Sequence, residues 1–461
     1  MKLVYQVNDK PTFAKTLVFA IQQLLAIMTA TLVVPIIING NAGLTGANAM
    51  SPAAALFGAG IGTFVYLLFT KLKSPVFLGS SFAFIGSMTA AFAGAVTVAV
   101  GYLGLIIGAL FAGLVYVIIA VAVKFAGVNW LNKLMPPVVI GPTVALIGLS
   151  LAGNAVGDLQ KGGYQVAGVS TAHPLLAVLC GLVTLIVVIL CSTYGKKTVK
   201  LIPFIIGIMS GYVFALVLTL IGMAAKVDAM KLISFESFKA LFADGVKFTS
   251  FIDLPDFTFV KAFGGFKNLS WDYFVTVLVA YVPVAFVVFA EHVADHKNIS
   301  SIIEKDLLEE PGLSKTLLGD GVGSMAGALF GGCPNTTYGE SVACVAISGN
   351  ASVITIVYTA ALALIVSLLN PFVAFINSIP ACVMGGVCIA LYGFIAVSGL
   401  KMIQKVNLEE NKNLFVVATI LITGIGGLSL TFGKVTITSI ATALILGIIV
   451  NQILSAKKSE N

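Results

Sequence analysis

A short polar segment, residues 334–340, is the first candidate for chemistry because it places one carboxylate between long apolar stretches. Its sequence is Pro-Asn-Thr-Thr-Tyr-Gly-Glu, in which Gly339 permits a break in regular backbone and Pro334 favours one. A carboxylate and freed backbone groups in apolar surroundings are costly unless they face protein, water or a ligand. The segment is therefore a candidate binding site built around Glu340.

A second group of ionisable residues follows a long apolar run that ends at Ala290. On a helix, Glu291 and Asp295 share one face, and His292 and His296 share the neighbouring face. Spacing alone leaves two readings open: the helix continues and presents these groups to a ligand, or it ends at Ala290 and the groups are hydrated. A zinc site is a weaker third reading, because no further metal ligand accompanies the two histidines.

Another polar break lies at residues 79–82, with the sequence Gly-Ser-Ser-Phe. Two interrupted segments that approach from opposite sides could present helix N-termini and unpaired N–H groups to the carbonyl oxygens of a ligand. The carboxylate of Glu340 would then accept the ligand's own N–H groups. This arrangement favours a flat, neutral heterocycle with alternating donors and acceptors, and it disfavours an anion.

The elements that must position these residues are membrane-spanning helices. Hydrophobic residues make up 59% of the 461-residue chain and charged residues 10%, with a mean hydropathy of +1.06, whereas soluble domains carry about 25% charged residues. A span needs about 20 mainly apolar residues, and such runs recur along nearly the whole chain. The sequence predicts an all-α, multi-pass membrane protein with about fourteen transmembrane segments.

Lysines indicate how these segments are oriented, because short cytoplasmic loops collect positive charge. With the N-terminus inside, lysines fall in alternate loops, at Lys71, Lys73, Lys124, Lys133, Lys196, Lys197, Lys200, Lys401, Lys405, Lys412, Lys457 and Lys458. We therefore expect both termini in the cytoplasm and the protein in the cell (plasma) inner membrane. The net charge of +7 reflects this topology and does not indicate nucleic acid.

The basic and sulfur-containing residues exclude two kinds of site. All 26 basic residues are lysine, so no arginine fork is available to hold a carboxylate or phosphate. The six cysteines lie in apolar runs without paired metal-ligand spacing, and they are typical of small buried residues. No metal and no cofactor are expected.

Weak internal similarity divides the chain into two halves. The matching segments, in order, are residues 56–63 with 317–324, 80–82 with 336–338, and 139–141 with 383–385. The first pair is glycine-rich, which favours close helix packing over nucleotide binding because no strand precedes it. Seven spans per half would invert the second half, which is typical of transporters. We predict repeats at 1–223 and 272–461, joined by an extracellular or interfacial connection at 224–271.

Several segments together carry a resemblance to one transporter family: residues 22–26 with Pro35, 75–84, 290–292, 305–308, 311–313, 335–340 and 383–386. They resemble segments of the nucleobase–ascorbate or nucleobase:cation symporter 2 family. They are spread over nearly the whole chain. The resemblance implies a fourteen-helix, seven-plus-seven inverted fold with core and gate domains, usually dimeric, that carries a nucleobase together with protons.

The same resemblance implies roles for individual residues. The implied substrate-binding residues are Glu291 and Glu340, with backbone contacts at Phe82 and Gly339 and with Ala30, Tyr338 and Tyr392 lining the pocket. Glu291, Glu340 and Asp295 are the implied proton-coupling residues. Glutamate at position 340 is similar to uracil-type members, whereas purine-type members usually carry glutamine, so uracil is the expected substrate.

Two departures from the family pattern affect these expectations. Ser341 replaces the usual asparagine, which removes a polar support expected for Glu340, and Asp295 replaces a histidine that some members carry. The alternatives are a purine or xanthine carrier on the same fold, an anion transporter of the same architecture, and, from another class, an intramembrane aspartyl protease using Asp295 and Asp320. The anion carrier is disfavoured because acidic groups would repel its ligand.

Overall fold

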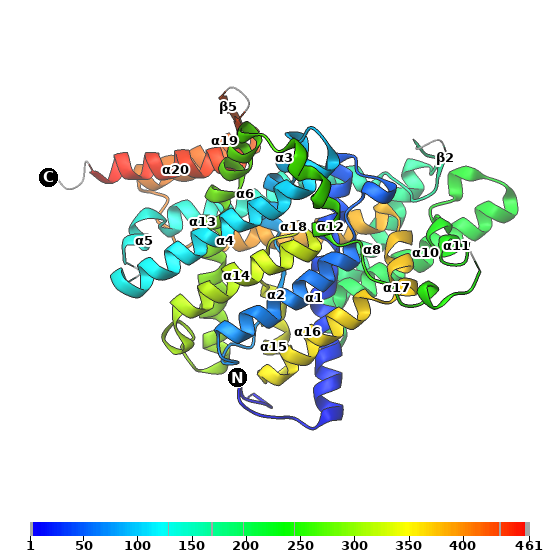
Figure 1. Ribbon diagram of the computed structural model, residues 1–461, viewed down its shortest axis with the longest axis horizontal. Helices are drawn as coiled ribbons and strands as arrows, with labels where there is room; N and C mark the ends of the chain where they lie inside the picture. Colours follow the sequence, from blue (N-terminus) through cyan, green and yellow to red (C-terminus); the bar gives the residue numbers. More distant parts are fainter. Residues whose placement is uncertain are drawn as a thin grey trace.

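Apolar helices make up most of the computed structural model, which describes residues 3–127, 129–166, 169–196, 198–243, 245–432 and 435–456 (Figure 1). Lys197, Lys457 and Lys458, part of the orientation argument, lie outside the described residues. Eight helical stretches are long and apolar enough to span a membrane: α1 (Phe13–Ala42), α2 (Pro52–Phe69) with η1 (Gly46–Asn48), α4 (Val98–Ala126), α6 (Pro137–Ser150) with α7 (Ala152–Leu159), α8 (Pro174–Tyr194), α10 (Pro203–Ala225), α13 (Trp271–Ile303) and α18 (Ala381–Ile403).

Six further helices, of 9 to 19 residues, complete the membrane part of the described chain. They are α3 (Ile85–Ala93), α14 (Leu313–Gly331), α15 (Gly339–Ser348), α16 (Val353–Ser367), α19 (Asn411–Ile425) and α20 (Ser439–Ala456). Together with the long stretches they give fourteen segments, which confirms the expected fold class.

Contacts between helices repeat in the two halves, as an inverted repeat requires. The helix α2 packs against α14, and α4 packs on α14 as α16 packs on α2. Likewise α13 contacts α4 as α1 contacts α16, and α8 pairs with α10 as α19 pairs with α20 (Figure 1). The core thus contains α1–α4 and α13–α16, and the gate contains α6–α10 and α18–α20. The boundaries expected at residues 223 and 272 remain a prediction.

The glycine-rich segments form the crossing between α2 and α14. A Cβ atom added at Gly62 would lie 2.7 Å from the carbonyl oxygen of Gly323, and one added at Gly58 would overlap the carbonyl oxygen of Gly327. Side chains at these positions would push the helices apart. Without a hydrophobic drive between helices in lipid, such backbone approach supplies the packing energy, in agreement with the packing role expected from the sequence.

Two short strands meet where the broken segments were expected. The strand β1 (Leu78–Ser80) pairs antiparallel with β4 (Asn335–Thr337), with Gly79 opposite Thr336. β1 leads through η2 (Phe82–Phe84) into α3, and β4 leads into α15. Since each strand pairs with the other, both chain breaks satisfy their backbone groups inside the protein, as membrane depth demands.

The connection between the halves folds as short helices over one end of the bundle. It contains η3 (Asp228–Met230), α11 (Glu236–Leu241), η4 (Phe248–Ser250), α12 (Thr258–Ala262) and η5 (Phe263–Asn268). α11 packs on α17 (Asn370–Ser378), and α12 and η5 pack on α4. Phe248, Phe263 and Phe266 are exposed here. Asp244 of this connection lies outside the described residues.

Smaller elements close the remaining loops. These are α5 (Asn129–Leu134), the pair β2 (Gln165–Val166) and β3 (Val169–Ser170), α9 (Thr198–Leu201), η6 (Leu308–Gly312), and the pair β5 (Leu430–Phe432) and β6 (Val435–Ile437). Lys73, after α2, forms an ion pair with Glu310 of η6, and this lysine lowers the pKa of the Glu310 carboxyl. The pair joins the loop after α2 to the loop before α14.

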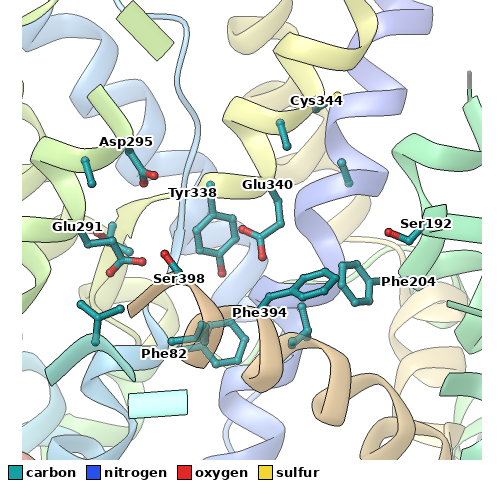
Figure 2. Close-up of a pocket in the computed structure, with 18 of the residues that line it drawn as sticks. Phe82, Ser192, Phe204, Glu291, Asp295, Tyr338, Glu340, Cys344, Phe394 and Ser398 are labelled. Carbon is teal, nitrogen blue, oxygen red and sulfur yellow. The ribbon is translucent and has the colours of Figure 1, made fainter. Parts of the chain in front are cut away.

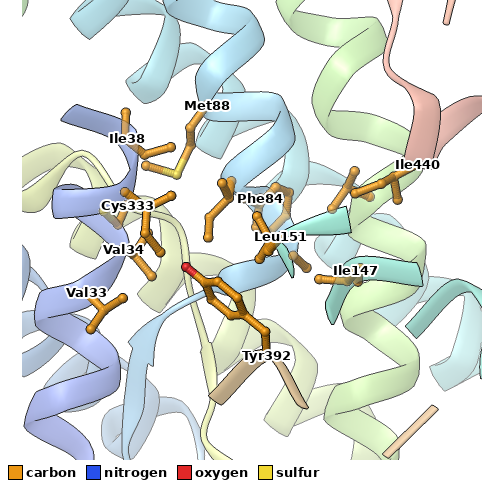
Figure 3. Close-up of a cluster of buried hydrophobic side chains, with 14 of the residues drawn as sticks. Val33, Val34, Ile38, Phe84, Met88, Ile147, Leu151, Cys333, Tyr392 and Ile440 are labelled. Atoms are coloured by element: carbon orange, nitrogen blue, oxygen red, sulfur yellow. The ribbon is translucent and has the colours of Figure 1, made fainter. Parts of the chain in front are cut away.

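A buried apolar cluster fills the seam between core and gate beside the crossing strands. Figure 3 shows Val33, Val34 and Ile38 of α1 facing Phe84 of η2, Met88 of α3 and Tyr392 of α18. Ile147, Leu151 and Ile440 continue the cluster toward the gate helices. This packing closes one end of the seam. The other end holds a cavity.

Candidate ligand-binding cavity between core and gate

A cavity of about 390 Å³ lies between the core and the gate, next to the crossing strands. Its core wall comes from Ala26, Phe82, Ala83, Glu291, Ala294, Asp295, Thr336, Tyr338, Gly339, Glu340, Ala343, Cys344 and Ile347, and its gate wall from Val144, Ile147, Ser192, Lys200, Leu201, Pro203, Phe204, Leu391, Phe394, Ile395, Ser398 and Met402. The walls are mostly apolar, with a few polar groups, which is typical of a small-molecule site.

The helix α13 carries two carboxylates into this cavity. It continues without interruption to Ile303, so the reading in which the helix ends at Ala290 is wrong. Glu291 and Asp295 both line the cavity. His292 and His296 are fully buried on the other side of the helix, with their rings stacked at 4.0 Å between centroids. The face-sharing expected from the four-residue spacing is therefore observed.

The helix α15 brings the third carboxylate from its first turn. β4 ends at Thr337, Tyr338 takes an extended conformation, and the helix begins at Gly339. Glu340 therefore stands at a helix N-terminus, where free N–H groups favour acceptor atoms of a ligand. Figure 2 shows Glu291 and Glu340 on opposite sides of the Tyr338 ring, with both side chains directed toward the space next to Phe82.

Tyr338 joins the two broken segments. Its hydroxyl donates to the carbonyl oxygen of Ser80 at 2.7 Å, and Thr31 of α1 donates to the same hydroxyl at 3.4 Å. The ring lies against Gly79, where an added Cβ atom would overlap it. Only glycine fits at position 79, because any side chain there would displace the tyrosine that borders the cavity.

Asp295 is held by a hydrogen bond from β4. The Thr337 hydroxyl donates to Asp295 Oδ2 at 2.8 Å, which joins α13 to the strand that precedes Glu340. This bond fixes the position of one carboxylate relative to the others. A charge-assisted bond of this kind is roughly twice as strong as a neutral one.

Ser341 supports the backbone around the cavity. Its hydroxyl accepts from Gln23 Nε2 at 2.5 Å and from the Phe77 N–H at 3.1 Å, and it is fully buried. It thereby connects α15 with α1 and with the segment before β1. The sequence suggested a lost support for Glu340 at this position; the structure places an anchor for the helix that carries Glu340 there.

Two of the residues implied by family resemblance lie behind the cavity wall. Tyr392 of α18 is buried, and its ring meets the Phe82 ring edge-on at 6.1 Å between centroids. Ala30 is buried in α1, one turn after the cavity-lining Ala26. Neither is among the residues that line the cavity in the described chain, and their assignment as pocket residues stays a prediction.

The gate wall contains residues that the sequence reasoning did not select. Ser192, Lys200, Phe204, Phe394 and Ser398 line the cavity, and Figure 2 shows Ser398 and Phe394 across from Tyr338 and Glu340. The only sequence signal was polarity inside an apolar span, as at Ser398 in residues 381–403. Many serines in membrane helices share that signal, which explains why it did not single this one out.

Asp320 belongs to a separate buried cluster. Its Oδ2 atom lies 2.7 Å from His292 Nδ1, and His292 Nε2 lies 3.0 Å from the Thr316 hydroxyl. His296 Nε2 lies 2.7 Å from the Tyr66 hydroxyl. Asp320 is thus paired on the far side of α13 from the cavity-lining Asp295, so the two aspartates do not form a protease dyad.

Comparison with known proteins agrees with this geometry. A model described as "Permease family" matches residues 14–432. The chain belongs to this family, the nucleobase:cation symporter 2 permeases. It is a multi-pass membrane transporter, and the aspartyl protease alternative is wrong.

Relatives of this permease match over almost its whole length. It is 36% identical to a uracil permease of Bacillus caldolyticus over 99% of this chain and 96% of the relative. It is 35% identical to a uracil permease of Bacillus subtilis (98% and 96%) and 31% identical to one of Escherichia coli K12 (96% and 92%).

Solved structures share its fold. The transmembrane domain of the cyanobacterial bicarbonate transporter BicA aligns with a TM-score of 0.61 at 16% identity, covering 97% of this chain and 99% of that one. The murine anion transporter Slc26a9 aligns with a TM-score of 0.62 at 11% identity, covering 98% and 69%. These similarities establish the inverted seven-plus-seven architecture with core and gate domains.

Proposed function

We propose that this permease is a proton-coupled uracil symporter. The observation that carries the proposal is the placement of Glu291 and Glu340 in one small cavity, beside the N-terminus of α15 and the break at Phe82. The uracil permeases that match the chain over nearly its full length support the same substrate.

The cavity offers complementary groups to a flat, uncharged pyrimidine. Carboxylates accept hydrogen bonds, so Glu291 and Glu340 would accept the two ring N–H groups. Backbone N–H groups at Phe82 and at the start of α15, with Gly339, would donate to the ring carbonyls. The apolar faces of the ring would pack between Phe82 and the Tyr338 side of the cavity.

The charge of the cavity supports proton coupling. Three carboxylates, those of Glu291, Asp295 and Glu340, share one cavity inside the membrane, and their mutual repulsion falls when a proton binds. A proton and a neutral base can therefore occupy the cavity together at lower cost than the base alone. Movement of core against gate would then expose both to the other side.

The cavity lies near the helix ends that lead into lysine-rich loops. It reaches Ser192 near the end of α8 and Met402 near the end of α18, and these ends precede Lys196 and Lys405. By the positive-inside rule this side is cytoplasmic. The structure would then be the inward-open state, with both termini in the cytoplasm. We place the protein in the inner membrane of the cell as a homodimer.

Uptake of labelled uracil into proteoliposomes, with and without an imposed pH gradient, tests substrate and driving force together. We expect concentrative uptake only with an inward proton gradient. Uracil uptake that is the same with and without the pH gradient would refute proton coupling. Absence of uracil uptake would refute uracil as the substrate. Competition with xanthine, adenine and guanine separates the purine carrier, because a uracil carrier would keep its uptake in their presence.

A further inference from the structure

Lys200 is the single basic side chain among the described residues that line the cavity, which three carboxylates also line. It lies on α9, a short gate helix between α8 and α10, and is exposed. The other titratable groups lining the same cavity are Glu291 and Asp295 of α13 and Tyr338, Glu340 and Cys344 of the α15 segment.

The helix α9, which carries Lys200, lies at the boundary between core and gate. α9 contacts α1 and α15 of the core as well as its gate neighbours α8 and α10. The next residue, Leu201, packs with Ala26 of α1 and Cys344 of α15 in a small apolar cluster. A change in the position of the gate relative to the core therefore changes the distance from Lys200 to the carboxylate of Glu340 on α15.

An empty carrier must return through a closed state, and there ionised carboxylates are costly without a partner. A loaded carrier avoids this cost, because protons and the ligand's N–H groups occupy the carboxylates. We propose that Lys200 is the tethered counter-charge of the empty cavity, pairing with Glu340 as the empty carrier closes and giving way to proton and ligand in the loaded one. This inference rests on the proposed symport function.

The proposal predicts a split between two modes of transport. Net uptake requires return of the empty carrier, whereas exchange of internal for external uracil uses only the loaded form. In Lys200→Met, we expect net uptake to fall about tenfold, the effect of about 1.4 kcal/mol on a barrier, with exchange nearly unchanged. Lys200→Arg keeps the charge and should keep both modes.

Lys196→Met is the matched control, since Lys196 is exposed in the same loop and does not line the cavity. The test measures net uptake and exchange of labelled uracil for each variant in proteoliposomes. Equal loss of net uptake and exchange in Lys200→Met, no loss in either, or the same split in Lys196→Met would each overturn the proposal. Failure of the wild-type protein to transport uracil in either mode would instead overturn the proposed function.

Discussion

At the scale of single residues, the two glutamates make the most direct prediction. Glu291→Ala and Glu340→Ala each remove a charged acceptor for a ligand N–H group, and a hydrogen bond to a charged group contributes about 1.5–3 kcal/mol. We expect uracil uptake to be abolished in both, with a loss of at least about tenfold in binding affinity. Glu309→Ala, in the exposed loop after α13, is the control and should behave as wild type. Uptake retained by either cavity variant would refute the role of that glutamate.

Ser341 makes a different prediction, because it anchors backbone and does not line the cavity. Ser341→Ala would leave the Gln23 amide and the Phe77 N–H without this acceptor, and an unsatisfied buried polar group costs about 1–3 kcal/mol. Thermal unfolding in detergent should show a lower Tm for the variant, while the preference for uracil over other bases is unchanged. A change of substrate preference with unaltered Tm would contradict the anchoring role.

At the scale of elements, the crossing strands depend on Gly79. In Gly79→Ala, the new methyl group would overlap the Tyr338 ring and displace it from its bond to Ser80. Overpacking of this kind costs about 1–3 kcal/mol, so we expect a lower Tm and weaker uracil binding. Gly86→Ala is the matched control, because a Cβ atom there has its nearest neighbour at 3.8 Å. Equal behaviour of the two variants in thermal unfolding and in a binding titration would contradict this account.

The helices and strands also show which parts of the fold and of the cavity could be predicted from the sequence. Apolar run lengths predicted the spans, and the polar residues predicted breaks at 79–82 and 334–340 that could approach a ligand from opposite sides. The pairing of the two breaks as strands, which satisfies backbone groups freed at membrane depth, was not predicted. Residue types near Glu340 and Glu291 identified the core wall of the cavity. The gate wall was not predictable, since Lys200 and Ser398 have the composition of ordinary loop and helix residues and only the packing of α9 and α18 brings them to the cavity.

At the scale of the whole molecule, the seam between core and gate is filled at one end and open at the other. The apolar cluster around Phe84, Met88 and Leu151 closes one end (Figure 3), whereas the cavity extends to Ser192 and Met402 near the ends of α8 and α18. Packed interiors switch between discrete arrangements and do not deform continuously. The closed end is therefore the part that must open when the core moves against the gate.

This asymmetry predicts which side of the membrane reaches the cavity. In a background with all six cysteines replaced, Ser398→Cys should react with a membrane-impermeant thiol reagent added to the cytoplasmic side of inside-out vesicles, and uracil should slow the reaction. Asn377→Cys, exposed on α17 beside the connection between the halves, should react only from the opposite side. Mass spectrometry of the labelled protein measures both reactions. Faster labelling of Ser398→Cys from outside would show that the cavity opens there, and equal labelling of both variants from one side would contradict the orientation inferred from the lysines.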